Sequence, residues 1–484
     1  MFLMTLRGFA PALLVSSFLM AAGCGGGSGG GSSRGPVVDQ SDNTPSPGPV
    51  PGTASCPAVF EKAGVPVQWN FTTLAAQNVN AGGGSVTLEY VLANAGETNS
   101  YFLYIPSTDP LAPVIILNEA YNGIDWTGEG VDAQFAALGP GKHPDSFAPA
   151  YNGQDLVRYS PETSAPDGGS LRASVNLWLE SGFAVIKTYG RFYAGGALAN
   201  DVSDAVAPWY FIADRASTFA GRQLFTTGGS WGGLMALYGA AAAPDSVVPT
   251  AVAVTSAPVD LKAVRNYAMQ LPSDVPAASE EVNAFFSPYI RRIDASISRA
   301  GTSSSAPFDT TTLCSCLPDK VLAAHDDIDT IVPVAQTEQL QASCAGRVQP
   351  IFWRRSAQAA VQTAGLSHGD FGGRSAVTDV GTLVGAWIID QADVEPTVIP
   401  VDPDSFSGFL MTVSDARNRG ENTDYAIAAL RPLLSGKVWL QSTLGSTQPQ
   451  TGADFLAGLL NTLFGLQTTA ESVEEALTAN TLPF

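Results

Sequence analysis

From Pro113 to about Ala392 the sequence alternates short β-rich runs with segments of helical periodicity, and this alternation is the strongest constraint on the fold. The β-rich runs there are residues 113–121, 183–190, 223–229, 250–258 and 320–326. Strands that alternate with helices pair in parallel, and the connecting helices cover both faces of the sheet. The sequence therefore predicts an α/β fold with a mostly parallel central sheet.

Two segments depart from this alternation. About sixty residues separate the runs at 250–258 and 320–326, which is too long for an ordinary connection between a strand and a helix. The helical pattern at 280–301 predicts that this insertion, about 260–320, forms a helical cap over the carboxyl edge of the sheet. Residues 393–484 contain further helical patches and are predicted to form a C-terminal helical extension.

The amino end has the features of an export signal. Arg7 precedes an apolar run that ends in small residues, and Ala21-Ala22-Gly23-Cys24 is similar to a lipoprotein cleavage box in which the cysteine carries lipid. Residues 25–55 are rich in Gly, Ser and Pro, as flexible tethers are. We expect residues 1–24 and the tether to hold a folded domain, residues 56–392, at the bacterial cell envelope through Cys24. Secretion without the lipid is the alternative.

The net charge of the chain argues against nucleic acid as a partner. Lys and Arg total 24 against 44 Asp and Glu, a net charge of -20, whereas a nucleic-acid-binding protein should be basic.

The cysteines predict disulfide bonds. Besides Cys24 there are Cys56, Cys314, Cys316 and Cys344, an even number in an exported chain, which predicts two disulfides. Cys314 and Cys316 are too close to pair comfortably, so we expect each to bond either Cys56 or Cys344. A zinc site is the alternative, although no CxxC pair or histidine cluster accompanies these thiols.

A G-x-S-x-G motif, Gly228 to Gly232, lies between the strand predicted at 223–229 and the helix predicted at 230–243. Glycines permit the sharp turn that would raise Ser230 Oγ above the sheet as a nucleophile. The alternative is an unreactive glycine-rich bend, because a chain with 49 glycines produces such strings by accident.

An acid follows a later strand. Asp329 comes just after the strand predicted at 320–326, where a carboxylate that orients a catalytic histidine would lie. Asp326 and Asp327 precede it and are expected in a solvated loop or helix cap.

The chain has three histidines, which narrows the choice of catalytic base. His368 lies in a small, turn-prone loop and completes the chain order Ser, Asp, His of a nucleophile, an acid and a base. His143 lies in a loop before the serine, and His325 lies within the end of the strand that precedes Asp329.

The segments "GGSWGGLMALYGAAAAPDSVVPTAVAVTSAPVDL", "HDDIDTIVPVAQTEQL" and "GLSHGDFG" resemble the catalytic domain of the prolyl oligopeptidase (S9) serine peptidases, within the α/β-hydrolase superfamily. The resemblance covers about residues 113–392. It implies that Tyr121, in a Y-x-G context, donates its hydroxyl to the oxyanion together with the backbone N–H of Trp231. Tyr151 lies in a second copy of that context.

Two departures from the S9 pattern leave the substrate open. Members of that family usually carry a large N-terminal β-propeller, whereas about sixty residues, Cys56 to Pro113, precede the first matched strand here. A long insertion also follows Tyr121, beside the expected oxyanion loop. The resemblance implies an S9-like peptidase that needs no cofactor or metal. An esterase is the alternative hypothesis. A non-catalytic surface-binding lipoprotein is the third.

Lipidation of Cys24 is directly testable. Mass spectrometry of the membrane fraction should find the mature amino end as an acylated Cys24, and a Cys24→Ser variant should leave that fraction because it lacks the thiol that carries the lipid. An unmodified, unanchored amino end in the parent protein would contradict the anchoring hypothesis.

Overall fold

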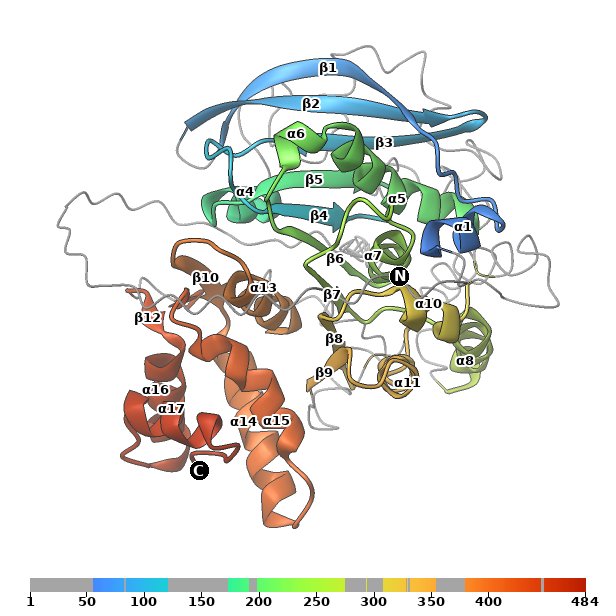
Figure 1. Cartoon of the computed structure of the whole chain (residues 1–484). Coiled ribbons are helices and arrows are strands. Elements are labelled where there is room, and N and C mark those ends of the chain that lie inside the picture. Colours follow the sequence, from blue (N-terminus) through green and yellow to red (C-terminus); the bar gives the residue numbers. More distant parts are fainter. Residues whose placement is uncertain are drawn as a thin grey trace, which may run out of the picture.

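A nine-stranded sheet forms the centre of the computed structural model (Figure 1). The structure describes residues 55–81, 84–120, 173–190, 198–274, 293, 308–327, 329, 331–353, 379–444 and 448–484. The strands of the large sheet are β1 (Asn70–Ala81), β2 (Gly84–Ala95), β3 (Thr98–Ile105), β4 (Val114–Asn118), β5 (Ala184–Tyr189), β6 (Leu224–Gly229), β7 (Ala251–Thr255), β8 (Val321–Asp326) and β9 (Val348–Trp353).

The sheet has the order β1-β2-β3-β5-β4-β6-β7-β8-β9. β1, β2, β3 and β5 pair antiparallel, and every pair from β5 through β4 to β9 is parallel. The predicted parallel sheet is therefore confirmed for its larger part. Because parallel strands point the same way, the carboxyl ends of β4 and of β6 to β9 lie along one edge.

Helices cover both faces of this sheet. The hydrophobic cluster on one face contains side chains of α1 (Cys56–Glu61), α5 (Leu198–Asp214), α6 (Ala216–Phe219), α7 (Trp231–Ala241), α8 (Leu261–Asp274), α10 (Thr310–Cys316) and α11 (Ala335–Ser343). The cluster on the other face contains side chains of α4 (Ala173–Glu180) and α13 (Asp379–Gln391). On β4, Val114 and Ile116 belong to the first cluster and Ile115 to the second, as strand geometry requires.

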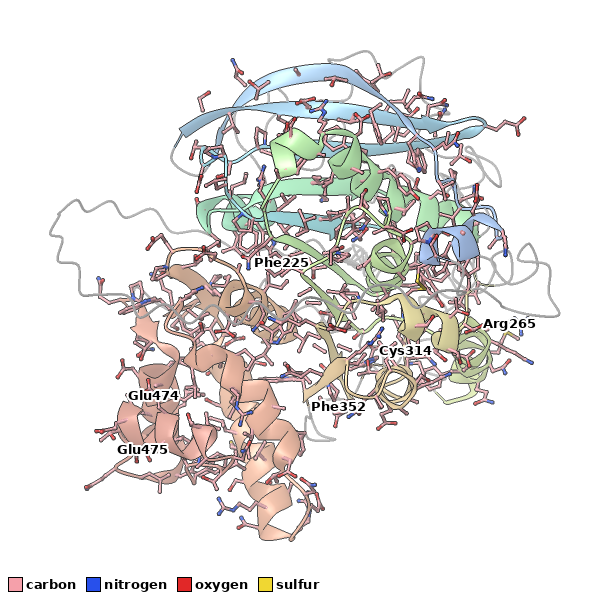
Figure 2. All side chains as sticks on the ribbon, in the orientation of Figure 1. Phe225, Arg265, Cys314, Phe352, Glu474 and Glu475 are labelled. Atoms are coloured by element: carbon pink, nitrogen blue, oxygen red, sulfur yellow. A yellow bond between two sulfur atoms is a disulfide. The ribbon has the colours of Figure 1, made fainter. Side chains whose placement is uncertain are left out.

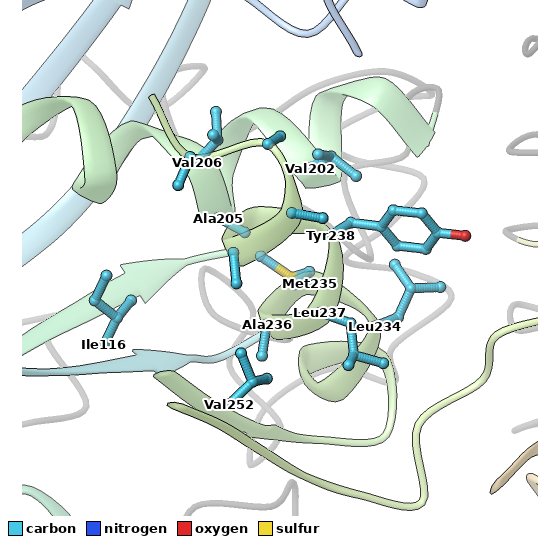
Figure 3. Close-up of a cluster of buried hydrophobic side chains, with 14 of the residues drawn as sticks. Ile116, Val202, Ala205, Val206, Leu234, Met235, Ala236, Leu237, Tyr238 and Val252 are labelled. Carbon is cyan, nitrogen blue, oxygen red and sulfur yellow. The ribbon is translucent and has the colours of Figure 1, made fainter. Parts of the chain in front are cut away.

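Helix α7 is buried along its whole length, which is why its sequence shows no polar face. Figure 3 shows its apolar side chains, among them Leu234 and Met235, between Ile116 and Val252 of the sheet and Val202 of α5. A Cβ on Gly239 would lie 2.8 Å from Cβ of Ala205, so the two helices approach closely only because position 239 is glycine.

A salt bridge ties the antiparallel strands to α5. Arg215, just after α5, donates to both carboxylate oxygens of Glu89 on β2, each at 3.1 Å. Burial acts to raise the pKa of Glu89, but the hydrogen bonds from Arg215 and Thr73 hold it below its ordinary value. Because this pKa is lowered in the folded chain, the stabilisation is present at neutral pH and is lost as the carboxyl is protonated in acid.

Two disulfides join helices that are distant in the sequence. Cys56 bonds Cys316 across 260 positions, and Cys314 bonds Cys344 across 30. This pairing agrees with the expectation that Cys314 and Cys316 take different partners. Since Cys316 and Cys314, the latter labelled in Figure 2, both lie on α10, the bonds link α1, α10 and the end of α11 covalently.

The C-terminal region is not purely helical, contrary to the prediction. It adds a second sheet of β10 (Thr397–Val401), β11 (Val438–Ser442) and β12 (Gln450–Thr451). Its helices are α14 (Pro403–Asn418), α15 (Asp424–Leu430), the 3₁₀ helix η3 (Arg431–Leu434), α16 (Gly452–Phe464) and α17 (Ala470–Thr478).

This region shares a core with the large sheet. Trp353, the last residue of β9, stacks on Phe409 of α14 with ring centroids 4.0 Å apart and meets Phe406 edge-on at 5.0 Å. The extension therefore packs against edge strand β9 as part of one hydrophobic cluster.

The contact at Gly239 predicts opposite effects of one substitution at two helical positions. Gly239→Ala should lower the free energy of unfolding by about 1–3 kcal/mol because the added methyl overpacks against Ala205. Gly458→Ala on α16, where a Cβ meets nothing within 4 Å, should raise it by about 0.5–1 kcal/mol. Urea unfolding measures both, and equal effects would refute the close packing of α5 on α7.

Candidate active site

Ser230 lies on a strained turn between β6 and α7. Its φ of 53° and ψ of -127° are unfavourable for a residue with a side chain, and among the described non-glycine residues only Ser256 and Asn480 also have positive φ. Hydrogen bonds hold the turn: the Ser230 N–H donates to Thr255 O at 2.8 Å, and the Gly233 N–H donates to Ser230 O at 2.9 Å. This is the backbone geometry expected of a nucleophile at the carboxyl end of a strand.

The glycines around Ser230 are required by close contacts. A Cβ on Gly228 would collide with the carbonyl oxygen of Gly232, and a Cβ on Gly232 would collide with that of Asn118 at the end of β4. A Cβ on Gly233 would lie 2.9 Å from the Ala257 side chain, closer than real carbon atoms approach. The motif is therefore not an accident of a glycine-rich composition. With the sheet topology, this turn defines an α/β-hydrolase fold.

Asp329 is a buried carboxylate in a fixed orientation. It is 4% exposed, and its Oδ1 accepts hydrogen bonds from the backbone N–H groups of Ile331 at 2.9 Å and Val332 at 2.8 Å. Asp326, expected in a solvated loop or cap, is instead the fully buried last residue of β8, and its carbonyl oxygen accepts the Asp329 N–H at 3.2 Å. Asp327 is exposed, as expected.

His325 supports this acid loop. It is fully buried, with Nε2 2.8 Å from Val332 O and Nδ1 2.8 Å from Thr337 Oγ1. Because a carbonyl oxygen only accepts hydrogen bonds, Nε2 carries a proton, and in the neutral imidazole Nδ1 accepts from the Thr337 hydroxyl. Asp329 Oδ2 lies 3.8 Å from Nε2. With both ring nitrogens engaged, His325 holds the loop rather than acting as a base.

The sheet brings the serine and the acid to one edge. β7 separates β6 from β8, and adjacent strands lie about 4.8 Å apart, so the strands that lead to Ser230 and Asp329 are roughly 10 Å apart. An imidazole placed above β7 could bridge such a gap. β9 ends at Trp353 along the same edge, and His368 follows fifteen positions later in the sequence. His368 and His143 lie outside the described residues.

Of the residues predicted to bind the oxyanion, the structure describes Trp231 alone. Trp231 is the first residue of α7, where a helix directs its N–H groups outward along its axis, and its indole is fully buried. The end of β4 lies beside it, because the position of a Cβ on Gly232 would be 3.8 Å from the Ala120 backbone nitrogen. Tyr121 and the rival Tyr151, like Cys24, lie outside the described residues.

Two polar residues of α11 belong to this framework, and the sequence did not reveal them. Gln336 is 2% exposed, and its Oε1 accepts from the N–H groups of Val259 at 2.9 Å and Asp260 at 2.7 Å. The next residue, Thr337, binds His325. A buried polar pair in the first turn of a helix gives no signal in a hydrophobic pattern, although it begins three positions after Pro333.

The described part of the chain contains no group of three or more His, Cys, Asp or Glu side chains that could hold a metal ion. Among the described helices, none has the length and apolar character needed to cross a membrane.

The comparisons with known proteins find similar solved structures. No family model and no curated protein matches the sequence. Similar solved structures include an esterase from Pyrococcus furiosus, with a TM-score of 0.33, 12% identity, and coverage of 65% of this chain and 89% of that one. They also include an acetyl xylan esterase from Paenibacillus sp. R4, with a TM-score of 0.35, 13% identity and coverage of 64% and 91%.

A peptidase is also among the similar structures. The acylaminoacyl peptidase of Pyrococcus horikoshii has a TM-score of 0.36 and 11% identity, and the match covers 57% of this chain and 38% of the peptidase. Likeness at this level carries no argument about activity, so the function of this chain is inferred from its own residues.

The contacts of His325 predict the effect of removing its hydroxyl partner. Thr337→Val should lower the free energy of unfolding by about 1–3 kcal/mol, because a buried imidazole nitrogen loses its hydrogen bond. The matched control is Thr462→Val on α16, where an exposed hydroxyl donates to its own helix and its loss should matter little. Urea unfolding compares the two, and an equal loss would contradict the bracing role of Thr337.

Proposed function

We propose that this chain is an exported serine hydrolase that acts through an acyl-enzyme, with Ser230 as nucleophile, His368 as base and Asp329 as the acid that orients the base. The observation that carries the proposal is the strained backbone of Ser230 at the carboxyl end of β6. Such strain persists only where the surrounding contacts enforce it, and it is concentrated at functional sites. Asp329 supports the same proposal, because it is buried and held by hydrogen bonds after β8, two strands away from β6.

In the proposed reaction His368 takes the proton of Ser230 Oγ while this oxygen attacks the carbonyl carbon of the substrate. The tetrahedral intermediate collapses as the imidazolium gives its proton to the leaving alcohol or amine, which departs and leaves the acyl group on Ser230. A water molecule then attacks in the same way, releases the carboxylic acid and restores the serine hydroxyl. Asp329 holds the ring in the productive tautomer throughout and stabilises its charged form.

The negative charge of the intermediate develops near α7. The Trp231 N–H and the positive end of the helix would stabilise it, and the Tyr121 hydroxyl is the proposed second donor. Burial raises the pKa of Tyr238 on the same helix far above its ordinary value, and its ring packs against those of Phe60 and Phe308.

The acyl substrate is proposed in two forms. The similarity of the sequence motifs to S9 peptidases favours a peptide. An extracellular ester is the second candidate, because the described residues 55–81 and 84–113 supply α1 and three strands of the catalytic sheet itself, where S9 peptidases carry a propeller. We place the enzyme at the bacterial cell envelope, held by Cys24 and its tether.

Active-site labelling tests the proposal. The parent protein should react with a fluorophosphonate probe and Ser230→Ala should not, because Oγ is the atom that is modified. Asp329→Asn should lower kcat on a short acyl ester by roughly 10⁴-fold because the ring loses its orienting carboxylate. The exposed neighbour Asp327→Asn should keep the parent rate.

The same proteins decide the substrate class. Rates on acyl esters are compared with rates on X-Pro and Ala-type peptide amides. Hydrolysis of the amides supports the peptidase, and activity confined to esters supports the esterase. A folded parent protein that neither labels nor turns over any of these compounds would be a non-catalytic binding protein, and the proposed chemistry would be wrong.

A further inference from the structure

Asn118, the last residue of β4, carries a buried polar side chain at the carboxyl edge of the sheet. It is 7% exposed, and its Nδ2 donates to Thr226 Oγ1 at 2.7 Å and to Thr227 O at 3.3 Å. Because a carbonyl oxygen only accepts hydrogen bonds, the atom that faces Thr227 O is the amide nitrogen. Oδ1 is buried and has no hydrogen-bond partner among the described residues. An unsatisfied acceptor lowers stability, so packing alone does not explain an asparagine here.

The hydroxyl of Thr226 connects this amide to the backbone of β4. Thr226 is fully buried on β6 and donates its hydroxyl to Ile116 O at 3.2 Å, so its oxygen is free to accept the bond from Asn118 Nδ2. Ile116 and Thr226 are partners in the parallel pairing of β4 with β6, and Asn118 and Gly228 are partners two residues further along. These side-chain bonds therefore tie the end of β4 to β6 just before the nucleophile turn.

Asn118 and Gly228 lie on the face of the sheet that α7 covers. Val114 and Ile116 of β4 belong to the hydrophobic cluster that contains α7, and alternate residues of a strand share a face. A Cβ on Gly228 would collide with Gly232 O in the first turn of α7, and a Cβ on Gly232 would collide with Asn118 O. The backbone of Asn118 is therefore packed against the first turn of α7, while its side chain holds that backbone on β6.

We propose that Asn118 is a positioning residue: by holding the end of β4 on β6, it fixes the first turn of α7 and with it the Trp231 N–H, an inference that rests on the proposed function. This N–H is a proposed donor to the negative oxygen of the tetrahedral intermediate. Gly232 follows Trp231 directly and lies against Asn118 O, so movement of the end of β4 would move the turn that presents the N–H. A donor of this kind acts only where the oxygen of the intermediate will lie, so a small displacement lowers the rate.

Three substitutions and a control test this role. Asn118→Leu keeps the approximate size of the side chain and removes both donated hydrogen bonds. Thr226→Val removes the hydroxyl that accepts from Nδ2, and Thr226→Ser keeps it. The control is Thr397→Val on β10, because Thr397 is also a buried threonine of a strand, and its hydroxyl donates to Glu395 O at 3.3 Å in the C-terminal region.

Each protein is assayed on a short acyl ester for kcat and KM and with the fluorophosphonate for its rate of labelling, and its Tm shows whether it is folded. Asn118→Leu and Thr226→Val should lose roughly tenfold in kcat with KM nearly unchanged, since the Trp231 N–H acts mainly on the charge of the transition state. The loss should stay below the roughly 10²- to 10³-fold caused by removing an oxyanion donor, because the N–H is displaced and not deleted. Labelling should slow to a similar extent, whereas Thr226→Ser and Thr397→Val should keep the parent kcat.

Parent-like kcat in Asn118→Leu or Thr226→Val overturns the proposal. A higher KM without a loss of kcat also overturns it, because the residue would then act on substrate binding. Equal losses in Thr226→Val and Thr226→Ser would show that the hydroxyl is not the cause. If Asn118→Leu does not fold, Thr226→Val decides, and failure of both to fold would show a purely structural role.

The parent protein separates this role from the proposed function. A folded parent protein that fails to label with the fluorophosphonate would reject the catalytic function itself, together with the role of Asn118. Labelling of the parent protein with parent-like kinetics in the variants rejects the role of Asn118 alone.

Discussion

The close approach of three backbone segments at the start of α7 is the constraint on which the candidate site depends. The end of β4, the turn at Ser230 and the residue after Ser256 meet where Gly228, Gly232 and Gly233 leave no room for a side chain. This crowding forces Ser230 into a conformation it would not adopt alone, and the bond from its N–H to Thr255 ties that conformation to the neighbouring strand. The nucleophile is thus oriented by packing before any substrate arrives.

The acid side of the site depends on a different kind of contact. Helix α11 reaches two loops with consecutive polar side chains: Gln336 satisfies the backbone after β7, and Thr337 satisfies His325 at the end of β8. Buried polar groups of this kind are stable only when every partner is present, so they hold their loops in one arrangement. The two halves of the site are therefore positioned mainly by different contacts, tight packing around the serine and hydrogen bonds around the acid.

The sequence predicted the strands that have a regular apolar pattern, and it did not predict the strands that lack one. Strands β4 to β8 were predicted because buried parallel strands are runs of apolar residues. β1, with many polar residues, and β9, interrupted by Pro350, lacked that pattern, as did the five-residue strands of the C-terminal sheet. Ser230 and Asp329 could be predicted as site residues because chain order and position after a strand can be recognised in a sequence. The positive φ of Ser256 and the role of Gln336 arise from long-range contacts that no local pattern records.

The disulfides have a mechanical consequence. Force applied to the chain at residue 55, the first that the structure describes, reaches Cys56 at once, and the bond to Cys316 transmits it to α10, 260 positions along the chain. Cys314 and Cys344 carry it on to the end of α11, the helix that holds both loops of the site. The tension is therefore not carried by the hydrogen bonds of edge strand β1, from which the sheet would otherwise unfold one strand at a time. A chain held at its amino end on a surface under flow, as proposed for this protein, would in this way transmit force through covalent bonds at the first residues that the structure describes.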